Sequence, residues 1–424
     1  MALLLMVVLL FLFVVVGKRV CKEWISPVYL CGTFWLTYTL FSYFFMRKLY
    51  HFSILGIAWI NISVWAMLLF EQIGKRKSRS TTQVSESPNS ISNISWIYLK
   101  LCCFLGFLAF IYQVSLYGFS FSSFTSLDAL ATMNNTIAVA RYTGNSITNI
   151  VTQILLIFVY AAPACGGFAF VYAESLKDKI WALVTFVPGF FMVLFTNTKA
   201  VIIGVVILWA SAYLVSYYFR HKAAPKINIR VFLIVSIIGV ILFSFLFLSM
   251  VLRIGEISEN SINDVINKFK IYAFGSVQSF DWWCGNEYKP TYRFGVMTYL
   301  GIADFVGLAQ KVQGVYTAYA GTSSNVFTVF RGIIEDYGYW GGIIYLAIKS
   351  FLGGMAWRTV CGGKRISVLS LSYLVSEIFF LLYGFIISPW TYMSYISAVV
   401  VFVGYLITAR NKNIYIVWGR KVLF

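Results

Sequence analysis

The chain has 424 residues, of which 60% are hydrophobic and only 11% are charged. Apolar runs long enough to cross a bilayer recur along the whole sequence, which no soluble core requires. A membrane β-barrel would instead show alternating strands of about ten residues. The composition therefore predicts an all-α protein that crosses the lipid bilayer many times.

The formal net charge of +18 raises the question of a nucleic-acid partner. Most of the basic residues, however, stand in short clusters beside the apolar runs, as the orientation of membrane helices by positive charge demands. We therefore expect the lipid bilayer as a partner and no nucleic acid.

Cysteine and histidine usage limits the chemistry. The seven cysteines are scattered, nearly all in or beside apolar segments, so neither a disulfide framework nor a CxxC metal site is expected. The two histidines, His51 and His221, lie near a predicted span end and in a basic loop. We expect no metal and no cofactor, and no histidine-activated nucleophile.

The first apolar run, "MALLLMVVLLFLFVVV", has no basic residue before it and Gly-Lys-Arg after it, the reverse of a secretory signal. It predicts a retained first span whose N-terminus is outside. About eleven spans are predicted, at residues 2–16, 25–45, 52–70, 96–116, 148–173, 180–195, 200–219, 231–251, 338–355, 366–387 and 391–409.

The basic residues orient these spans. When the spans are threaded alternately, one set of loops collects 20 of the 33 Lys and Arg residues: 17–24, 71–95, 174–179, 220–230, 356–365 and the C-terminal tail. These loops and the tail are therefore predicted to be cytoplasmic. Arg47 and Lys48 end up outside, so the orientation of the first three spans stays open.

Three regions follow from this layout. Residues 1–251 form a transmembrane bundle of spans 1–8, with a Ser-rich cytoplasmic linker at 71–95. Residues 252–337 form one large outer loop, and residues 338–424 hold spans 9–11 and the basic tail. The loop carries 8 of the 15 acidic residues, which makes it the expected location of function.

Two helices are predicted inside the loop. "SINDVINKFKIYAFG" begins with a capping-box pattern at Ser261 and has apolar residues at helical spacing, which is typical of a helix on the membrane surface or on the bundle. A second, less regular candidate starts at Arg293.

The stretch "TSSNVFTVFRGIIEDYGYWGG", residues 322–342, places three charged residues directly before an apolar run. Wound as a helix, it brings Arg331, Glu335 and Asp336 onto one polar face. Arg331 and Glu335 stand four residues apart, so a structural ion pair is one interpretation. The other is the wall of a wet cavity, because ionisable groups at membrane depth are costly and are retained for a task.

Further cations and aromatic rings are predicted on the same side. Lys199 opens a span in "TNTKA", Arg253 closes one, and Arg293 lies in the loop. Together with Arg331 they suit a diphosphate, which arginine binds through two parallel hydrogen bonds. "SFDWWCGNEYKPTYRF", residues 279–294, surrounds Asp281 with aromatic rings, which suits sugars but also any membrane interface.

Three segments resemble the O-antigen polymerase (Wzy) family of bacterial polysaccharide repeat-unit polymerases: "TNTKA", "YAFGSVQSFDWW" and "SSNVFTVFRGIIEDYGYWGG". The last is similar to the family's Asn-x-(Phe/Tyr)-Thr and Asp-(Phe/Tyr)-Gly-x-x-Gly patterns, here Asn325, Phe327, Thr328, Asp336, Tyr337, Gly338 and Gly341. With the span layout, the resemblance covers most of the chain.

The resemblance implies a glycosyltransferase C-like fold in the bacterial inner membrane, with a periplasmic loop at 252–337 and a cytoplasmic C-terminus. It implies en bloc transfer of a growing glycan from undecaprenyl diphosphate to a new lipid-linked repeat unit, as in lipopolysaccharide and polysaccharide biosynthesis. Donor and acceptor oligosaccharides, a chain-length regulator and a flippase would be its partners.

Residue roles follow from the chemistry of such a transfer. Asp336 is the leading candidate for the catalytic base, followed by Glu335 and Asp281. The candidates for binding diphosphate or substrate are Arg331, Arg253, Lys199, Arg293, Asn325 and Tyr272.

Two other functions stay open. An O-antigen ligase has a similar architecture, but its family uses an outer-loop histidine, which residues 252–337 lack. A flippase or other transporter of lipid-linked oligosaccharides would place charges in the middle of several spans, and here only Lys349 and Glu377 are so placed.

Overall fold

The structure is a computed structural model that describes most of the chain. The described residues are 2–48, 52–77, 94–119, 126–142, 147, 149–196, 199–226, 228–229, nine single residues from 233 to 247, 259–310, 317–319, 322–324, 326–362, 367–409, 416–418 and 421–423. Their regular secondary structure is helical apart from two short antiparallel pairs of strands, β1 (Thr317–Tyr319) with β2 (Thr322–Ser324) and β3 (Ile416–Trp418) with β4 (Lys421–Leu423).

The long helices coincide with most of the predicted spans. In chain order they are α1 (Ala2–Cys21), α2 (Pro27–Met46), α3 (Leu55–Lys77), α4 (Trp96–Leu116), α6 (Ile150–Tyr172), α9 (Lys199–His221), α13 (Val329–Gly362), α14 (Val368–Tyr383) and α15 (Met393–Thr408). Five helices in the described part are long and apolar enough to cross a membrane, namely α1, α3, α4, α6 and the part of α9 from Ala200 to His221. The chain is thus a helical, membrane-embedded protein, and the count of eleven spans stays a prediction.

The predicted span at 180–195 is not one helix. It is divided into α7 (Leu176–Val184) and α8 (Val187–Thr196), and a turn at Thr185 and Phe186 separates the two helices. Pro188 follows directly and disfavours helical backbone at the residue before it, so it belongs at the start of a helix rather than in its interior. The predicted span at 231–251 lies mostly outside the described residues.

The loop region contains α11 (Glu259–Asn286) and the short α12 (Leu300–Phe305). Helix α11 starts two residues before the predicted Ser261 and is much longer than the predicted segment. The helix predicted from Arg293 is wrong over its first turns, because Tyr292, Phe294 and Gly295 have positive φ angles that helical backbone does not allow. Helix α5 (Leu127–Tyr142) was not predicted.

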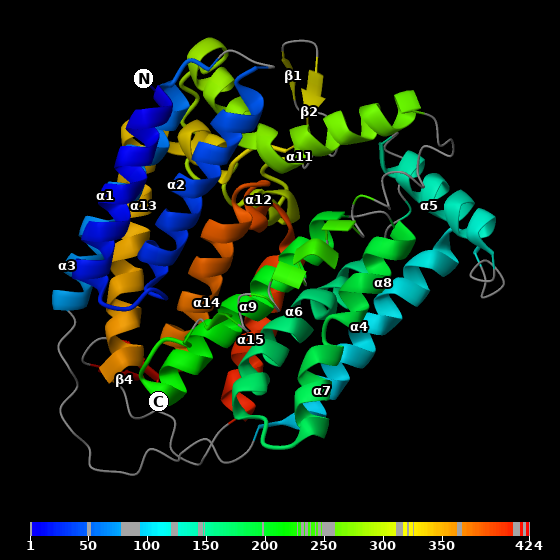
Figure 1. Cartoon of the computed structure of the whole chain (residues 1–424). Helices are drawn as coiled ribbons and strands as arrows, with labels where there is room; N and C mark the ends of the chain where they lie inside the picture. The colour runs from blue at the N-terminus through cyan, green and yellow to red at the C-terminus, as the bar shows by residue number, and fades with distance from the viewer. Residues whose placement is uncertain are drawn as a thin grey trace.

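The helices form two groups (Figure 1). Helices α1, α2, α3 and α13 stand together, α4 and α6–α9 form the second group, and α14 and α15 lie between them. Helix α11 lies across one end of the bundle, and we call this end the α11 end.

Loops predicted to share a side of the membrane meet in the structure. At the α11 end, Ser53 contacts Asp281 and Phe327 donates a backbone hydrogen bond to Ile386. At the opposite end, the Trp24 indole donates to Pro225 and the Lys222 ammonium donates to Val360. These contacts bring together segments that the sequence assigns to the same side, and the orientation of the spans in the membrane stays a prediction.

Small residues hold α3 against α13. A Cβ atom at Gly74 would collide with the carbonyl of Phe351, and one at Gly354 would collide with the carbonyl of Glu71. Only glycine lets the two backbones approach this closely. Burying large apolar side chains between two helices gains little free energy in lipid, because lipid tails are equally apolar, so membrane helices often pack through small residues. Helix α13 is thus fixed along α3 at this depth.

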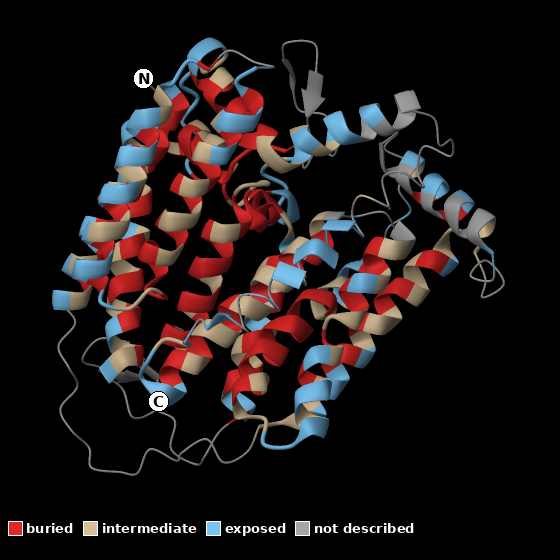
Figure 2. Cartoon of the chain, in the orientation of Figure 1, coloured by how far each residue is buried: buried red, intermediate tan, exposed pale blue. Residues whose placement is uncertain are grey.

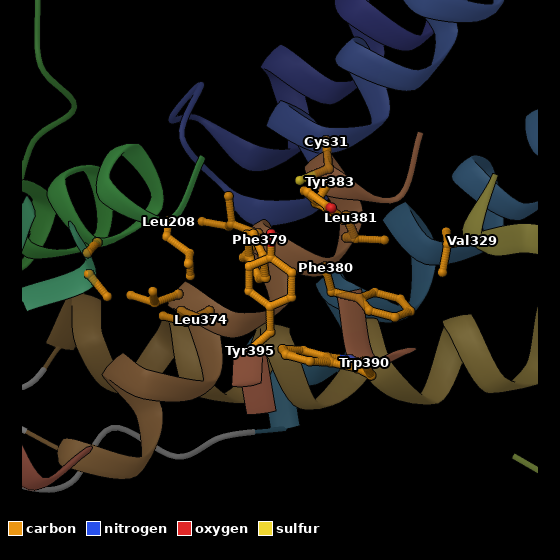
Figure 3. Close-up of a cluster of buried hydrophobic side chains, with 14 of the residues drawn as sticks. Cys31, Leu208, Val329, Leu374, Phe379, Phe380, Leu381, Tyr383, Trp390 and Tyr395 are labelled. Atoms are coloured by element: carbon orange, nitrogen blue, oxygen red, sulfur yellow. The ribbon is translucent and has the colours of Figure 1, made fainter. Parts of the chain in front are cut away.

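The core lies where the two groups meet (Figure 2). In Figure 3, Phe379, Phe380 and Tyr383 of α14 gather beside Trp390 and Tyr395. By contrast, α1 exposes many apolar side chains, Leu4 and Phe11 among them, as a lipid-facing helix does.

Candidate functional site

Asp281 of α11 caps the start of α3. Its carboxylate is fully buried and accepts hydrogen bonds from four backbone N–H groups, those of Ser53, Ile54, Gly56 and Ile57, at 2.6–3.3 Å. The Ser53 hydroxyl donates a fifth bond at 3.1 Å. The first N–H groups of a helix lack intrahelical partners and carry partial positive charge, so an anion here stabilises the helix end. Asp281 therefore ties α11 to α3.

Asp336 of α13 holds the turn that precedes α12. Its side chain is fully buried and accepts bonds from the N–H groups of Met297 at 2.9 Å and Thr298 at 2.7 Å, and from the Thr298 hydroxyl at 2.6 Å. The Thr298 carbonyl in turn accepts a bond from the Ser388 hydroxyl at 2.6 Å. The carboxylate thus joins three segments that are far apart in the sequence.

The backbone beside Asp336 departs from a helix. Gly338 has φ 71° and ψ 178°, which produces a kink inside α13. The carbonyls of Glu335 and Asp336 are freed by this kink and accept the N–H groups of Arg293 and Phe294 at 3.2 and 3.1 Å. A residue with a side chain is strained at such a φ, so the glycine lets the segment at 293–299 dock.

Arg331 and Glu335 form the predicted ion pair. Arg331 Nε lies 3.0 Å from Glu335 Oε1, and the two side chains are 20% and 15% exposed. The guanidinium also lies over two rings, 4.5 Å from the Phe327 centroid and 5.1 Å from the Trp283 centroid. These contacts fix a cation in place at the α11 end while leaving the pair partly open to solvent.

The other predicted residues fall into two sets. Arg293 is exposed, and its backbone bond to Glu335 brings it to the Arg331 pair, with its guanidinium 3.5 Å from the Met297 sulfur. Tyr272 is exposed on α11, the helix that carries Asp281. Lys199 is the first residue of α9, as predicted, but its side chain lies outside the described part. Arg253 and Asn325 also lie outside the described residues.

Thr298 and Ser388 were missed by sequence reasoning. Both are buried and connect Asp336 to the residues before the short helix η2 (Pro389–Thr391). The hydrogen-bond partner of a Ser or Thr side chain in a loop cannot be predicted from neighbouring residues, so the sequence did not indicate a role for Thr298 or Ser388. Cys284, also at this end, is no nucleophile candidate, because burial raises the pKa of its thiol and keeps it protonated.

No three His, Cys, Asp or Glu side chains in the described part come together as a metal site would require. The site is therefore a cluster of buried carboxylate anchors, Asp281 and Asp336, around one partly open Arg331–Glu335 pair. The chain matches no family model, no curated protein and no solved structure.

Proposed function

We propose that the chain is a membrane glycosyltransferase that polymerises lipid-linked oligosaccharide repeat units at the α11 end of the bundle. The observation that carries the proposal is the partly exposed guanidinium of Arg331, which contacts two aromatic rings and forms an ion pair with a carboxylate. The finer topology proposed with it is eleven spans in the bacterial inner membrane, a periplasmic loop at 252–337 and a cytoplasmic C-terminus.

Arg331 would bind the diphosphate of the donor. Cleavage of the bond between sugar and diphosphate develops negative charge on the leaving oxygen, and a cation already held in place stabilises that charge without reorganisation. The planar guanidinium matches two phosphate oxygens at once. Arg293, docked beside Glu335 through its backbone, is the second cation that supports this role.

The geometry favours Glu335 over Asp336 and Asp281 as the catalytic base. A base must accept a proton from the acceptor hydroxyl, so it needs an oxygen open to the substrate. Asp281 and Asp336 are fully buried and their oxygens already accept five and three hydrogen bonds, so a substrate would have to displace those donors. Glu335 is partly exposed, and Arg331 is its ion-pair partner. The sequence-based order with Asp336 first stays a prediction, and the geometry favours Glu335.

The proposed step transfers one glycan and one proton. The acceptor hydroxyl oxygen bonds to the anomeric carbon of the donor, and the bond from that carbon to the diphosphate oxygen breaks. The hydroxyl proton passes to the Glu335 carboxylate, and polyprenyl diphosphate leaves with the bonding electron pair beside Arg331. No nucleotide is needed, because the donor is already a diphosphate ester.

Purified protein incubated with synthetic undecaprenyl-diphosphate-linked repeat units tests the proposal. The natural chain should give a ladder of products, and Glu335→Gln and Arg331→Ala should give none while still folding. Glu287→Gln, which removes a carboxylate from the same loop region, is the matched control and should keep the ladder. A single addition to a different lipid acceptor would instead identify a ligase, and substrate movement across vesicles without new bonds would identify a flippase.

A further inference from the structure

Glu377 of α14 is a buried carboxyl group that the proposed glycosyl transfer does not use. It has no exposed surface, and neither of its oxygens accepts a hydrogen bond from any group in the described part of the chain. A bare carboxylate inside a helical bundle is strongly unfavourable unless it is paired or takes up a proton. Ionisable groups at this depth in membrane proteins usually serve a function.

Lys349 of α13 is the cation that faces this carboxyl group. The two groups interact electrostatically, yet no nitrogen–oxygen contact of 4.0 Å or less joins them among the described ion pairs. The ammonium instead lies over aromatic rings, 4.6 Å from the Phe380 centroid and 5.5 Å from the Tyr373 centroid. Lys349 therefore balances charge near Glu377 without satisfying its oxygens.

Helix α13 packs directly against the Glu377 carboxyl group at Gly353. A Cβ atom at Gly353 would collide with Glu377 Oε2, so glycine at this position admits the side chain. The other titratable groups that act on the pair are Cys31 of α2, Glu71 and Lys75 of α3, and Tyr373 of α14. Glu71 and Lys75 are paired with each other at 3.2 Å, so neither is a direct partner for Glu377.

Three tyrosine side chains, Tyr373, Tyr345 and Tyr299, interact electrostatically between this interior site and the α11 end, and a hydrogen bond joins the hydroxyls of Tyr345 and Tyr299. Tyr373, one helical turn from Glu377, donates to the Lys349 carbonyl at 2.7 Å and interacts electrostatically with both Glu377 and Tyr299. Tyr299, directly before α12, shares a hydrogen bond of 2.7 Å with Tyr345. A hydroxyl group both donates and accepts hydrogen bonds, so a row of hydroxyl groups can pass a proton from one to the next. Water molecules would complete the path where two hydroxyl groups are too far apart to form a hydrogen bond.

We propose that Glu377 is a proton-binding site inside the bundle, filled from the α11 end through Tyr299, Tyr345 and Tyr373, with Lys349 as its counter-ion. In the step, hydronium gives a proton to the Glu377 carboxylate, which forms one O–H bond and releases one water molecule. The pair of Glu377 and Lys349 then changes from neutral to a single positive charge. A proton adds almost no volume, so it can bind a carboxyl oxygen against which Gly353 already packs closely.

Infrared spectroscopy of the full chain in lipid across a pH series tests the site, because a protonated carboxyl group has its own carbonyl band. A band should appear as the pH falls, and Glu377→Gln should lose it, whereas Glu174→Gln at an exposed carboxylate should keep it. Lys349→Met removes the counter-ion, so its band should persist to higher pH.

Tyr345→Phe gives a second measurement that leaves Glu377 in place. After a rapid drop in pH, the band should develop more slowly than in the natural chain, because one hydroxyl of the path is missing. The proposal is overturned if no Glu377-dependent band appears at any pH at which the protein stays folded. It is also overturned if sodium at constant pH, rather than protons, produces the change, since the site would then bind a metal cation.

Discussion

The Asp336 carboxylate accepts hydrogen bonds from both the backbone N–H and the hydroxyl of Thr298, at 2.7 and 2.6 Å. This relationship ties the kinked segment of α13 to the turn before α12. It also means that a change at Asp336 affects structure and activity together, and the two effects have to be separated by experiment.

Replacing Asp336 by Asn should lower the free energy of unfolding by about 1–3 kcal/mol, because two charge-assisted bonds weaken and one buried donor loses its acceptor. Thr298→Val, which removes one of the same bonds without touching the carboxylate, should also destabilise the protein. Thermal unfolding in detergent measures both. A fully stable Asp336→Asn protein that makes no product would restore Asp336 as the leading base.

Asp281→Ala should destabilise the protein more than an ordinary loss of a helix cap, which costs about 1 kcal/mol. Four backbone N–H groups and one hydroxyl would lose their acceptor together, and the N–H groups of Gly56 and Ile57 are buried. Asp281→Asn should be milder, since the amide oxygen still accepts. Hydrogen exchange of residues 53–57 gives the local measurement, and unchanged protection there in the Ala variant would contradict the capping role.

Arg331→Lys should fail to make the polymer ladder almost as completely as Arg331→Ala. Lysine keeps the charge but loses the planar group that lies over Trp283 and Phe327 and that binds two phosphate oxygens together. The ladder assay with each variant at equal protein measures this. Full activity of the Lys variant would show that charge alone is sufficient.

Gly338→Ala should cost about 1–3 kcal/mol, because an alanine is strained at φ 71° and its Cβ would lie 3.0 Å from the Tyr292 ring. Gly362→Ala, near the end of the same helix, has nothing within 4 Å of the added atom and should be neutral or slightly stabilising. Comparing the apparent melting temperatures of the two variants checks the prediction. Equal losses in both would rule out backbone strain at Gly338.

The sequence predicted what depends on local spacing. Apolar runs such as 150–172 have to be helices of membrane length, and α6 occupies that range. Arg331 and Glu335 are four residues apart, so their pair could be expected from helix geometry alone. The assignment of short basic loops to one side of the membrane stays a prediction.

Long-range contacts were not predictable in this way. The partners of Asp281 lie more than 220 residues earlier, at 53–57, and nothing local distinguishes a capping carboxylate from a catalytic one. Asp336 was placed on the polar face of an ideal helix, but its side chain points instead to Thr298. Helix α5 has a mixed composition with no long apolar run, so the search for membrane spans did not indicate a helix at these residues.

The link between Asp281 and α3 restricts how a large substrate can approach. Lifting the C-terminal part of α11 from the bundle would take the acceptor away from four backbone N–H groups and one hydroxyl at once, two of the N–H groups buried, so this part of α11 stays attached to α3. The N-terminal part of α11, where Tyr272 and Ile266 are exposed, has no such attachment to α3 through Asp281. For the proposed glycosyl transfer, this attachment predicts that the substrate approaches Arg331 from the N-terminal part of α11 rather than past Trp283.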